Sequence, residues 1–125
     1  MNAAQDMPHV LVVEDNPDAA EILGMLIECE GFTTATAHSL AEARQHLADQ
    51  PPRMVFLDLS LPDGSGMDLL AEIKSDQTQA HIEVVLLTGS QDLREMEQAH
   101  LLGAAGFLVK PLGHAELTAV LQRAR

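Results

Sequence analysis

Five short runs of apolar residues recur along this chain, and each is followed by a longer stretch whose apolar residues are spaced as in a helix. The runs occupy residues 10–13, 32–37, 54–57, 84–87 and 106–109. Most of them lack the alternation of a half-exposed strand, which is typical of strands covered on both faces. A repeated strand and helix predicts a parallel sheet with right-handed crossovers and helices on both sides. We therefore expect a doubly wound, three-layer (βα)5 domain of the α/β class.

Residues that favour helix ends lie between these runs. Asn16 and Pro17 are suited to a first helical turn, and Ser39 begins a capping box. Gly31 and Gly103 are suited to helix ends. The chain therefore predicts helices that start near residues 16, 39, 65 and 92, and a last one after residue 111.

The first of these helices carries the single cysteine of the chain. Apolar spacing places Ile22, Leu23, Leu26 and Cys29 near one face, so we expect Cys29 to have a packing role. One cysteine cannot form an internal disulfide, which fits a reducing cytosol.

Length and charge limit the classes of partner. A chain of 125 residues fits one domain, and we expect a flexible arm over residues 1–8 and a single domain over residues 9–125, with no output domain. The formal net charge is −12 and the seven Lys and Arg residues are scattered, so neither nucleic acid nor a membrane surface should attract the domain. No apolar run approaches the roughly 18 residues that span a bilayer, and no secretory signal is visible. We expect a cytoplasmic protein.

Polar side chains stand where four of the predicted strands end. Glu14 and Asp15 follow the first strand, Asp58 the third, Thr88 the fourth and Lys110 the fifth. Taken singly, each has an ordinary explanation as a solvated acid, a hydroxyl that caps a turn or a surface lysine. Because the carboxyl ends of parallel strands meet at one edge of the sheet, we expect these side chains to converge in one crevice.

Three carboxylates in one crevice repel one another unless a proton is retained or a cation is bound. Mg²⁺ prefers oxygen ligands and commonly combines one or two carboxylates with a phosphate oxygen. Lys110 adds a compact positive charge and Thr88 a hydroxyl, and both suit the oxygens of a phosphoryl group. Asp58 is then the candidate nucleophile for phosphoryl transfer, which would form an acyl phosphate.

Four motifs mark these strand ends. They read Val12-Val13-Glu14-Asp15-Asn16-Pro17, Phe56-Leu57-Asp58-Leu59-Ser60-Leu61-Pro62-Asp63-Gly64-Ser65-Gly66, Leu86-Leu87-Thr88-Gly89-Ser90 and Phe107-Leu108-Val109-Lys110-Pro111. In this order and at these separations, the chain resembles a receiver domain of the two-component response regulators over essentially its whole length. Glu14 stands where Asp is commoner in that family.

The resemblance implies a flavodoxin-like sheet of order 2-1-3-4-5. It also implies that Asp58 is the phosphoacceptor, and that a sensor histidine kinase or a histidine phosphotransfer protein is the phosphoryl donor. By the same resemblance, Asp15, Asp58 and the backbone carbonyl of Ser60 would ligate Mg²⁺ directly. Glu14 would act through metal-bound water.

The resemblance further implies a two-state switch. Thr88 and Lys110 would hold the phosphoryl oxygens, and the peptide bond from Lys110 to Pro111 would be cis. Thr88 would move toward the phosphoryl group and Phe107 would turn inward, although Phe107 is also a plain core candidate. An unidentified downstream protein would read the changed surface of the fourth helix, fifth strand and fifth helix. Such a domain assists its own phosphorylation and dephosphorylation without being a conventional enzyme, and we expect a monomer or weak dimer.

Three other functions compete with this one. A phosphatase of the haloacid dehalogenase kind needs a second Asp two residues after its nucleophile, where this chain has Ser60. A flavin or nucleotide binder needs a Gly-rich turn after the first strand, where this chain has Glu14 and Asp15. A phosphorylation-independent protein-interaction module of the same fold stays open.

Overall fold

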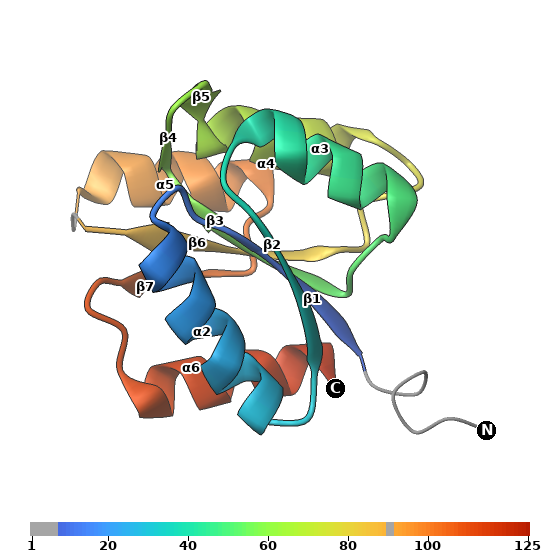
Figure 1. The fold of residues 1–125 in the computed structure, drawn as a ribbon. Helices are drawn as coiled ribbons and strands as arrows, with labels where there is room; N and C mark the ends of the chain where they lie inside the picture. The colour runs from blue at the N-terminus through green and yellow to red at the C-terminus, as the bar shows by residue number, and fades with distance from the viewer. Residues whose placement is uncertain (1–7, 90–91) are drawn as a thin grey trace.

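A five-stranded parallel sheet is the central feature of the computed structural model, which describes residues 8–89 and 92–125 (Figure 1). The strands lie in the order β2 (Thr33–Ala37), β1 (His9–Val13), β3 (Met54–Asp58), β6 (Glu83–Thr88) and β7 (Gly106–Val109). When only the five strands of this sheet are numbered along the chain, this is the predicted order 2-1-3-4-5. Of the arm predicted over residues 1–8, only Pro8 is among the described residues, and Ser90 of the fourth-strand motif lies outside them.

Helices cover both sides of the sheet (Figure 1). On one side lie α2 (Pro17–Cys29) and α6 (His114–Leu121), which a short 3-10 turn over Gln122–Ala124 continues. On the other side lie α3 (Leu40–Asp49), α4 (Gly66–Ser75) and α5 (Leu93–Leu102). The predicted three-layer α/β fold is confirmed.

Each side of the sheet has its own apolar core, because successive residues of a strand point to opposite faces. Leu57 and Leu86 pack with α3, α4 and α5, whereas Phe56 and Val85 pack with α2 and α6. The central strands are thus covered on both sides, which accounts for their continuous apolar sequences. Among the described residues, no helix has the length and apolar character needed to span a membrane.

The predicted helix ends are present. The Asn16 side chain accepts the N–H groups of Asp18 and Ala19 at 3.0 and 3.1 Å, and the Ser39 side chain accepts the N–H of Glu42 at 3.1 Å. Gly103 ends α5 with a φ of 101°, a left-handed conformation that glycine adopts at little cost.

The predicted inner face of α2 is wrong for three of its four residues. Ile22 is 60% exposed, Leu26 is 41% exposed, and Cys29 is also exposed and has no packing role in the core. The buried residues of α2 are instead Ala20, Leu23, Gly24 and Ile27. Because nearly every position from 22 to 27 is apolar, the spacing did not identify one face. Gly24 faces β2 closely, since a Cβ there would lie 3.5 Å from Thr34 Oγ1.

A small hairpin follows β3 within the segment predicted only as a turn. Its strands are β4 (Ser60–Leu61) and β5 (Gly64–Ser65), which pair in antiparallel fashion. The chain then enters α4 at Gly66, where an added Cβ would overlap the carbonyl oxygen of Asp58. The start of α4 is therefore packed directly on the end of β3.

Candidate functional site

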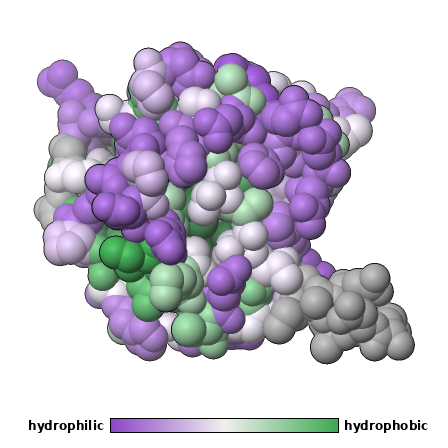
Figure 2. Space-filling model, in the orientation of Figure 1, coloured by the Kyte–Doolittle hydropathy of each residue, from purple (hydrophilic) through white to green (hydrophobic). Residues whose placement is uncertain are grey.

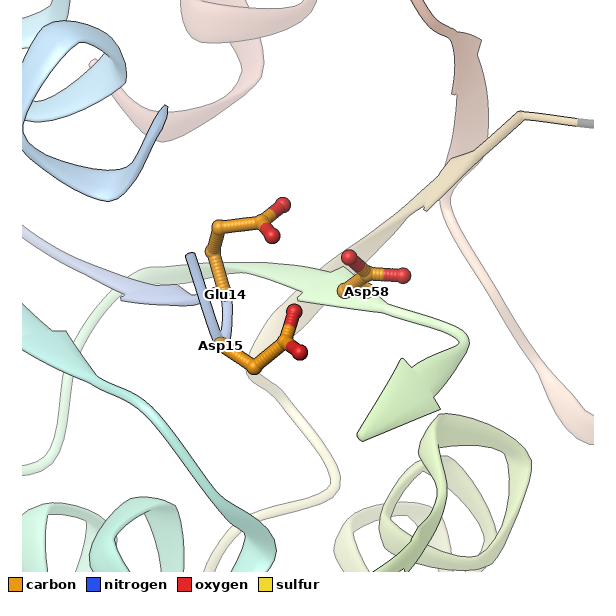
Figure 3. A group of neighbouring side chains, drawn as sticks. All are labelled: Glu14, Asp15 and Asp58. Carbon is orange, nitrogen blue, oxygen red and sulfur yellow. The ribbon is translucent and has the colours of Figure 1, made fainter. Parts of the chain in front are cut away.

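The ends of β1 and β3 bring three carboxylates together (Figure 3). Glu14 and Asp15 directly follow β1, and Asp58 is the last residue of β3. The two strands are neighbours, and one carboxylate oxygen from each of the three residues lies within 4.8 Å of the others. Glu14 and Asp58 are buried, whereas Asp15 is exposed. The cluster is thus shielded from water on one side and open on the other.

Lys110, which follows β7, places its ammonium group on two of these carboxylates. Its Nζ donates hydrogen bonds to Asp58 Oδ2 at 2.7 Å and to Glu14 Oε2 at 2.8 Å. One side chain therefore links the ends of β7, β3 and β1. Three carboxylates and one ammonium leave a formal charge of about −2 at this edge of the sheet.

Burial and charge act in opposite directions on the titration of these groups. Burial raises the pKa of the Glu14 carboxyl; the hydrogen bond from Lys110 opposes this rise, and the neighbouring Asp58 adds to it. Burial acts to lower the pKa of Lys110, but its hydrogen bonds to Asp58 and Glu14 outweigh burial, and the pKa is raised. Lys110 is therefore protonated at neutral pH.

Backbone N–H groups hold the two buried acids. Ser60 N donates to Asp58 Oδ1 at 3.0 Å, and Asn16 N donates to Glu14 Oε1 at 3.3 Å. Both oxygens of Asp58 thus have a donor, Ser60 on one and Lys110 on the other. These two hydrogen bonds restrict rotation of the carboxylate.

The remaining predicted side chains lie on β6 and β7. Thr88 is the buried last residue of β6, and its backbone carbonyl accepts the Lys110 N–H at 2.8 Å. Phe107 pairs with Leu86, is half-buried and packs against the core beneath α3, α4 and α5, nearer the amino end of β7. The peptide bond from Lys110 to Pro111 is cis, as the resemblance implies. The five polar residues therefore share one edge, as predicted.

An apolar groove beside the carboxylates is a feature that the sequence did not predict. It has a volume of about 300 Å³ and lies between α2 and the segment that follows β7. Glu14 and Lys110 line it together with Ala19, Ile22, Leu23, Leu26, Leu87, Pro111 and Leu112. Figure 2 shows hydrophobic side chains gathered on the surface in this region. Its signal in the sequence was the excess of apolar residues in the first helix, which were assigned to the core.

The carboxylate cluster suits a hard divalent cation. Mg²⁺ takes oxygen ligands, and the cluster offers carboxylate oxygens whose net charge after pairing with Lys110 such an ion would balance. Asp15 is exposed, so the cluster is open to solvent on that side. Over residues 8–89 and 92–125, no other group of three acidic, histidine or cysteine side chains is close enough to share a metal. The residues therefore fit the Mg²⁺ that the resemblance implies.

Comparisons with known proteins agree with this geometry. Residues 10–122 match the family model of the response regulator receiver domain. The transcriptional regulatory protein KdpE of Mycobacterium tuberculosis is 35% identical over 118 residues, which cover 94% of this chain and 51% of KdpE. The DNA-binding response regulator MtrA of Mycolicibacterium smegmatis is 32% identical over 110 residues, which cover 88% of this chain and 47% of MtrA. The chain thus spans about half the length of these curated relatives.

The fold also has a close counterpart among solved structures. The receiver domain of NtrX from Brucella abortus matches with a TM-score of 0.84 and 32% identity, over 92% of this chain and 96% of that chain. The family match covers most of the chain, KdpE is similar to it in sequence, and the NtrX receiver domain is similar to it in sequence and in fold. The chain belongs to the response regulator receiver domain family of two-component signalling.

Proposed function

We propose that this domain is a phosphoacceptor switch in which Asp58 receives a phosphoryl group from a phosphohistidine. The donor would be a sensor histidine kinase or a histidine phosphotransfer protein. The observation that carries the proposal is the pairing of Asp58 with Lys110 inside a cluster of three carboxylates. A carboxylate held at both oxygens is a positioned nucleophile, and a neighbouring ammonium offsets the charge of an incoming phosphoryl group.

In the transfer step, a carboxylate oxygen of Asp58 attacks the phosphorus atom of the phosphohistidine. The P–O bond of an acyl phosphate forms, the P–N bond breaks, and the imidazole leaves with the electron pair. Lys110 and the Thr88 hydroxyl are the groups that would bind the phosphoryl oxygens. Mg²⁺ would neutralise charge on those oxygens while held by Asp15, Asp58 and the Ser60 carbonyl, with Glu14 acting through a bound water.

The apolar groove along α2 is the docking surface for the donor in this proposal. A donor must bring its phosphohistidine to Asp58, so the surface around that histidine has to cover the rim of the site. Ile22 and Leu26 form part of this rim and are exposed in the free domain. Acidic residues and no Lys or Arg flank them on α2: Asp18, Glu21 and Glu28. A helix with apolar residues beside basic ones would complement this surface.

The output surface in this proposal comprises α5, β7 and α6. Thr88 at the end of β6 would move toward the acyl phosphate, and Phe107 on β7 would turn further inward, because Thr88 would no longer fill the space. The partial exposure of Phe107 supports this role over that of a plain core residue. The domain would assist its own phosphorylation and dephosphorylation, with no other substrate turned over, and an unidentified protein would read the surface.

We further propose that residues 9–125 form one cytoplasmic receiver domain that acts as a monomer or weak dimer. The net charge of −12 over the whole chain would repel a phosphate backbone, so the domain itself would not bind DNA. MtrA is named as a DNA-binding regulator, but the matched stretch is 47% of that protein. Its name therefore does not assign DNA binding to this domain.

The test is the intact mass of the protein after incubation with acetyl phosphate, with and without Mg²⁺. We expect a gain of one phosphoryl group that depends on Mg²⁺ and is absent from Asp58→Asn. Asp68→Asn is a matched control, because Asp68 is an exposed acid in the first turn of α4.

A gain that persists in Asp58→Asn would assign the phosphoryl group to another residue. No gain in the folded wild type, together with failure to bind a beryllofluoride mimic, would contradict the proposal. That result would favour the alternative, a protein-interaction module that works without phosphorylation.

A further inference from the structure

A carboxylate outside the cluster holds the hairpin that follows Asp58. Asp63 lies in the turn between β4 and β5, and its side chain reaches the start of α3. Its Oδ1 accepts the N–H of Leu40 at 2.8 Å, and its Oδ2 accepts the N–H of Ala41 at 3.1 Å. Both N–H groups belong to the first turn of α3, where a helix has no acceptor of its own.

Asp63 and Ser39 together cap the amino end of α3. The Ser39 side chain accepts only the N–H of Glu42 in this turn. The N–H of Leu40 lowers the pKa of Asp63, with the N–H of Ala41 and the charge of Arg44 adding to the effect. The carboxylate is therefore ionised at neutral pH and is attracted to the positive end of α3.

The hairpin also contacts Asp58, the proposed phosphoacceptor. Leu61 is buried in the core, and a Cβ at Gly64 would lie 2.8 Å from Leu40 Cδ1, so the hairpin lies tightly on α3. Ser60 at the start of β4 donates its N–H to Asp58 Oδ1 at 3.0 Å. A continuous set of contacts thus runs from the backbone of α3 through Asp63 and the hairpin to the nucleophile.

We propose that Asp63 is a positioning residue for the phosphorylation site. By holding the hairpin on α3, it keeps the Ser60 backbone in place, and with it the carbonyl expected to bind Mg²⁺, while Lys110 still holds the Asp58 carboxylate. This inference rests on the proposed function. Loss of Asp63 leaves the carboxylates of Glu14, Asp15 and Asp58 in place but loosens the Ser60 carbonyl. Mg²⁺ binding should therefore weaken, while the rate of phosphorylation at saturating Mg²⁺ should be kept.

The test compares Asp63→Ala and Asp63→Asn with the wild type. Asp76→Ala is the matched control, because Asp76 is also an exposed acid that accepts a backbone N–H, from Thr78 at 2.8 Å, in a turn at the end of α4. Mg²⁺ affinity is measured by calorimetry without a phosphodonor. The rate of phosphorylation by acetyl phosphate is then measured against Mg²⁺ concentration.

We expect Asp63→Ala to raise the Mg²⁺ concentration for half-maximal binding and rate about tenfold, as for other residues that orient metal ligands. The maximal rate should stay within about twofold of wild type, since every group that touches the phosphoryl is kept. Asp63→Asn, which keeps one acceptor oxygen, should have an intermediate effect, and Asp76→Ala none. Unchanged Mg²⁺ dependence in folded Asp63→Ala would overturn the inference.

Amide hydrogen exchange at Ser60, measured without Mg²⁺ or phosphodonor, separates this inference from the proposed function. We expect faster exchange at Ser60 in Asp63→Ala, with exchange in β1 and β3 unchanged. If the wild type took up no phosphoryl group, the proposed function would fail, yet faster exchange would still show that Asp63 holds the hairpin. Equal exchange at Ser60 in both proteins would overturn the positioning role itself.

Discussion

Helices α2 and α4 lie on opposite sides of the sheet and differ in how far their apolar residues are buried. α4 buries all of its large apolar side chains: Met67, Leu69, Leu70 and Ile73. α2 buries Leu23 and Ile27 but leaves Ile22, Met25 and Leu26 substantially exposed. The apolar residues of α4 are thus all used by the fold, whereas α2 carries more of them than the core can take.

The difference separates residues needed for folding from residues available for recognition. Ile22 and Leu26 stay 60% and 41% exposed in the domain, and they line the groove that also contains Glu14 and Lys110. Ile27 is fully buried on the same helix. Neighbouring positions of α2 therefore serve different purposes, and substitutions can test them separately.

The largest effect on stability is expected from Ile27→Ala. Removing a fully buried isoleucine leaves a cavity, so we expect a loss of about 2–5 kcal/mol in the free energy of unfolding. Met25→Ala, at a position 58% exposed on the same helix, should change it by less than about 0.5 kcal/mol. Urea unfolding followed by circular dichroism is the measurement, since the chain has no Trp or Tyr. Equal losses in the two variants would refute the division of α2 into two sides.

The next effect is expected on phosphotransfer rather than stability. Ile22→Ser combined with Leu26→Ser should slow transfer from a histidine kinase that phosphorylates the wild type by about tenfold, or roughly 1.4 kcal/mol. Phosphorylation by acetyl phosphate, which needs no docking surface, should be unchanged. Leu93→Ser is the control, because Leu93 is an exposed leucine on α5 that does not line the groove. Slowing by both donors would mean that the variant disturbs the site and not the docking.

A smaller effect is expected from the ion pair that joins α4 to its neighbour α3. Arg44 donates two hydrogen bonds to the carboxylate of Glu72, at 2.7 and 2.9 Å, but both side chains are about half exposed. Arg44→Ala should lower the melting temperature only slightly, and about 1 M NaCl should abolish the difference from wild type. A double-mutant cycle with Glu72→Ala measures the coupling. A difference that persists in salt would indicate that Arg44 acts through packing.

The smallest effect is expected at His9, which lies at the amino end of β1, away from the groove. Burial lowers the pKa of His9, the nearby His46 adds to this, and Nδ1 lies 2.8 Å from Thr33 Oγ1. His9 therefore binds a proton more readily in the unfolded chain than in the folded one. The free energy of unfolding should fall as pH drops below about 6.5. His9→Gln should flatten the dependence of stability on pH in that range, and His81→Gln is the control. An unchanged pH dependence in His9→Gln would assign the loss to other groups.

The fold could be predicted because its signals are local or follow from topology. Caps such as Asn16 and Ser39 depend on neighbouring backbone alone, and the alternation of strands and helices restricts the sheet to few arrangements. The inner face of α2 could not be predicted in this way. Ile22 and Leu23 are equally apolar, and only packing in the core shared with β1, β3 and α6 decides which of them is buried.

The same distinction applies to the site. The meeting of Glu14, Asp15, Asp58 and Lys110 follows from parallel strands, because all four residues lie at strand ends. The contact of Asp63 with α3 does not follow from any periodicity. It joins residues more than twenty positions apart and depends on a hairpin with strands of two residues each. Lengths this short leave no alternation to detect.

Gly66 has a consequence for how this protein tolerates genetic change. Its φ is not positive, so the backbone conformation does not itself demand glycine. An added methyl group would nevertheless overlap the carbonyl oxygen of Asp58. Replacement by alanine, ordinarily among the mildest of exchanges, would push α4 away from the end of β3, where Asp58 lies. In a population of functional variants, position 66 should therefore vary as little as Asp58, although it carries no reactive group.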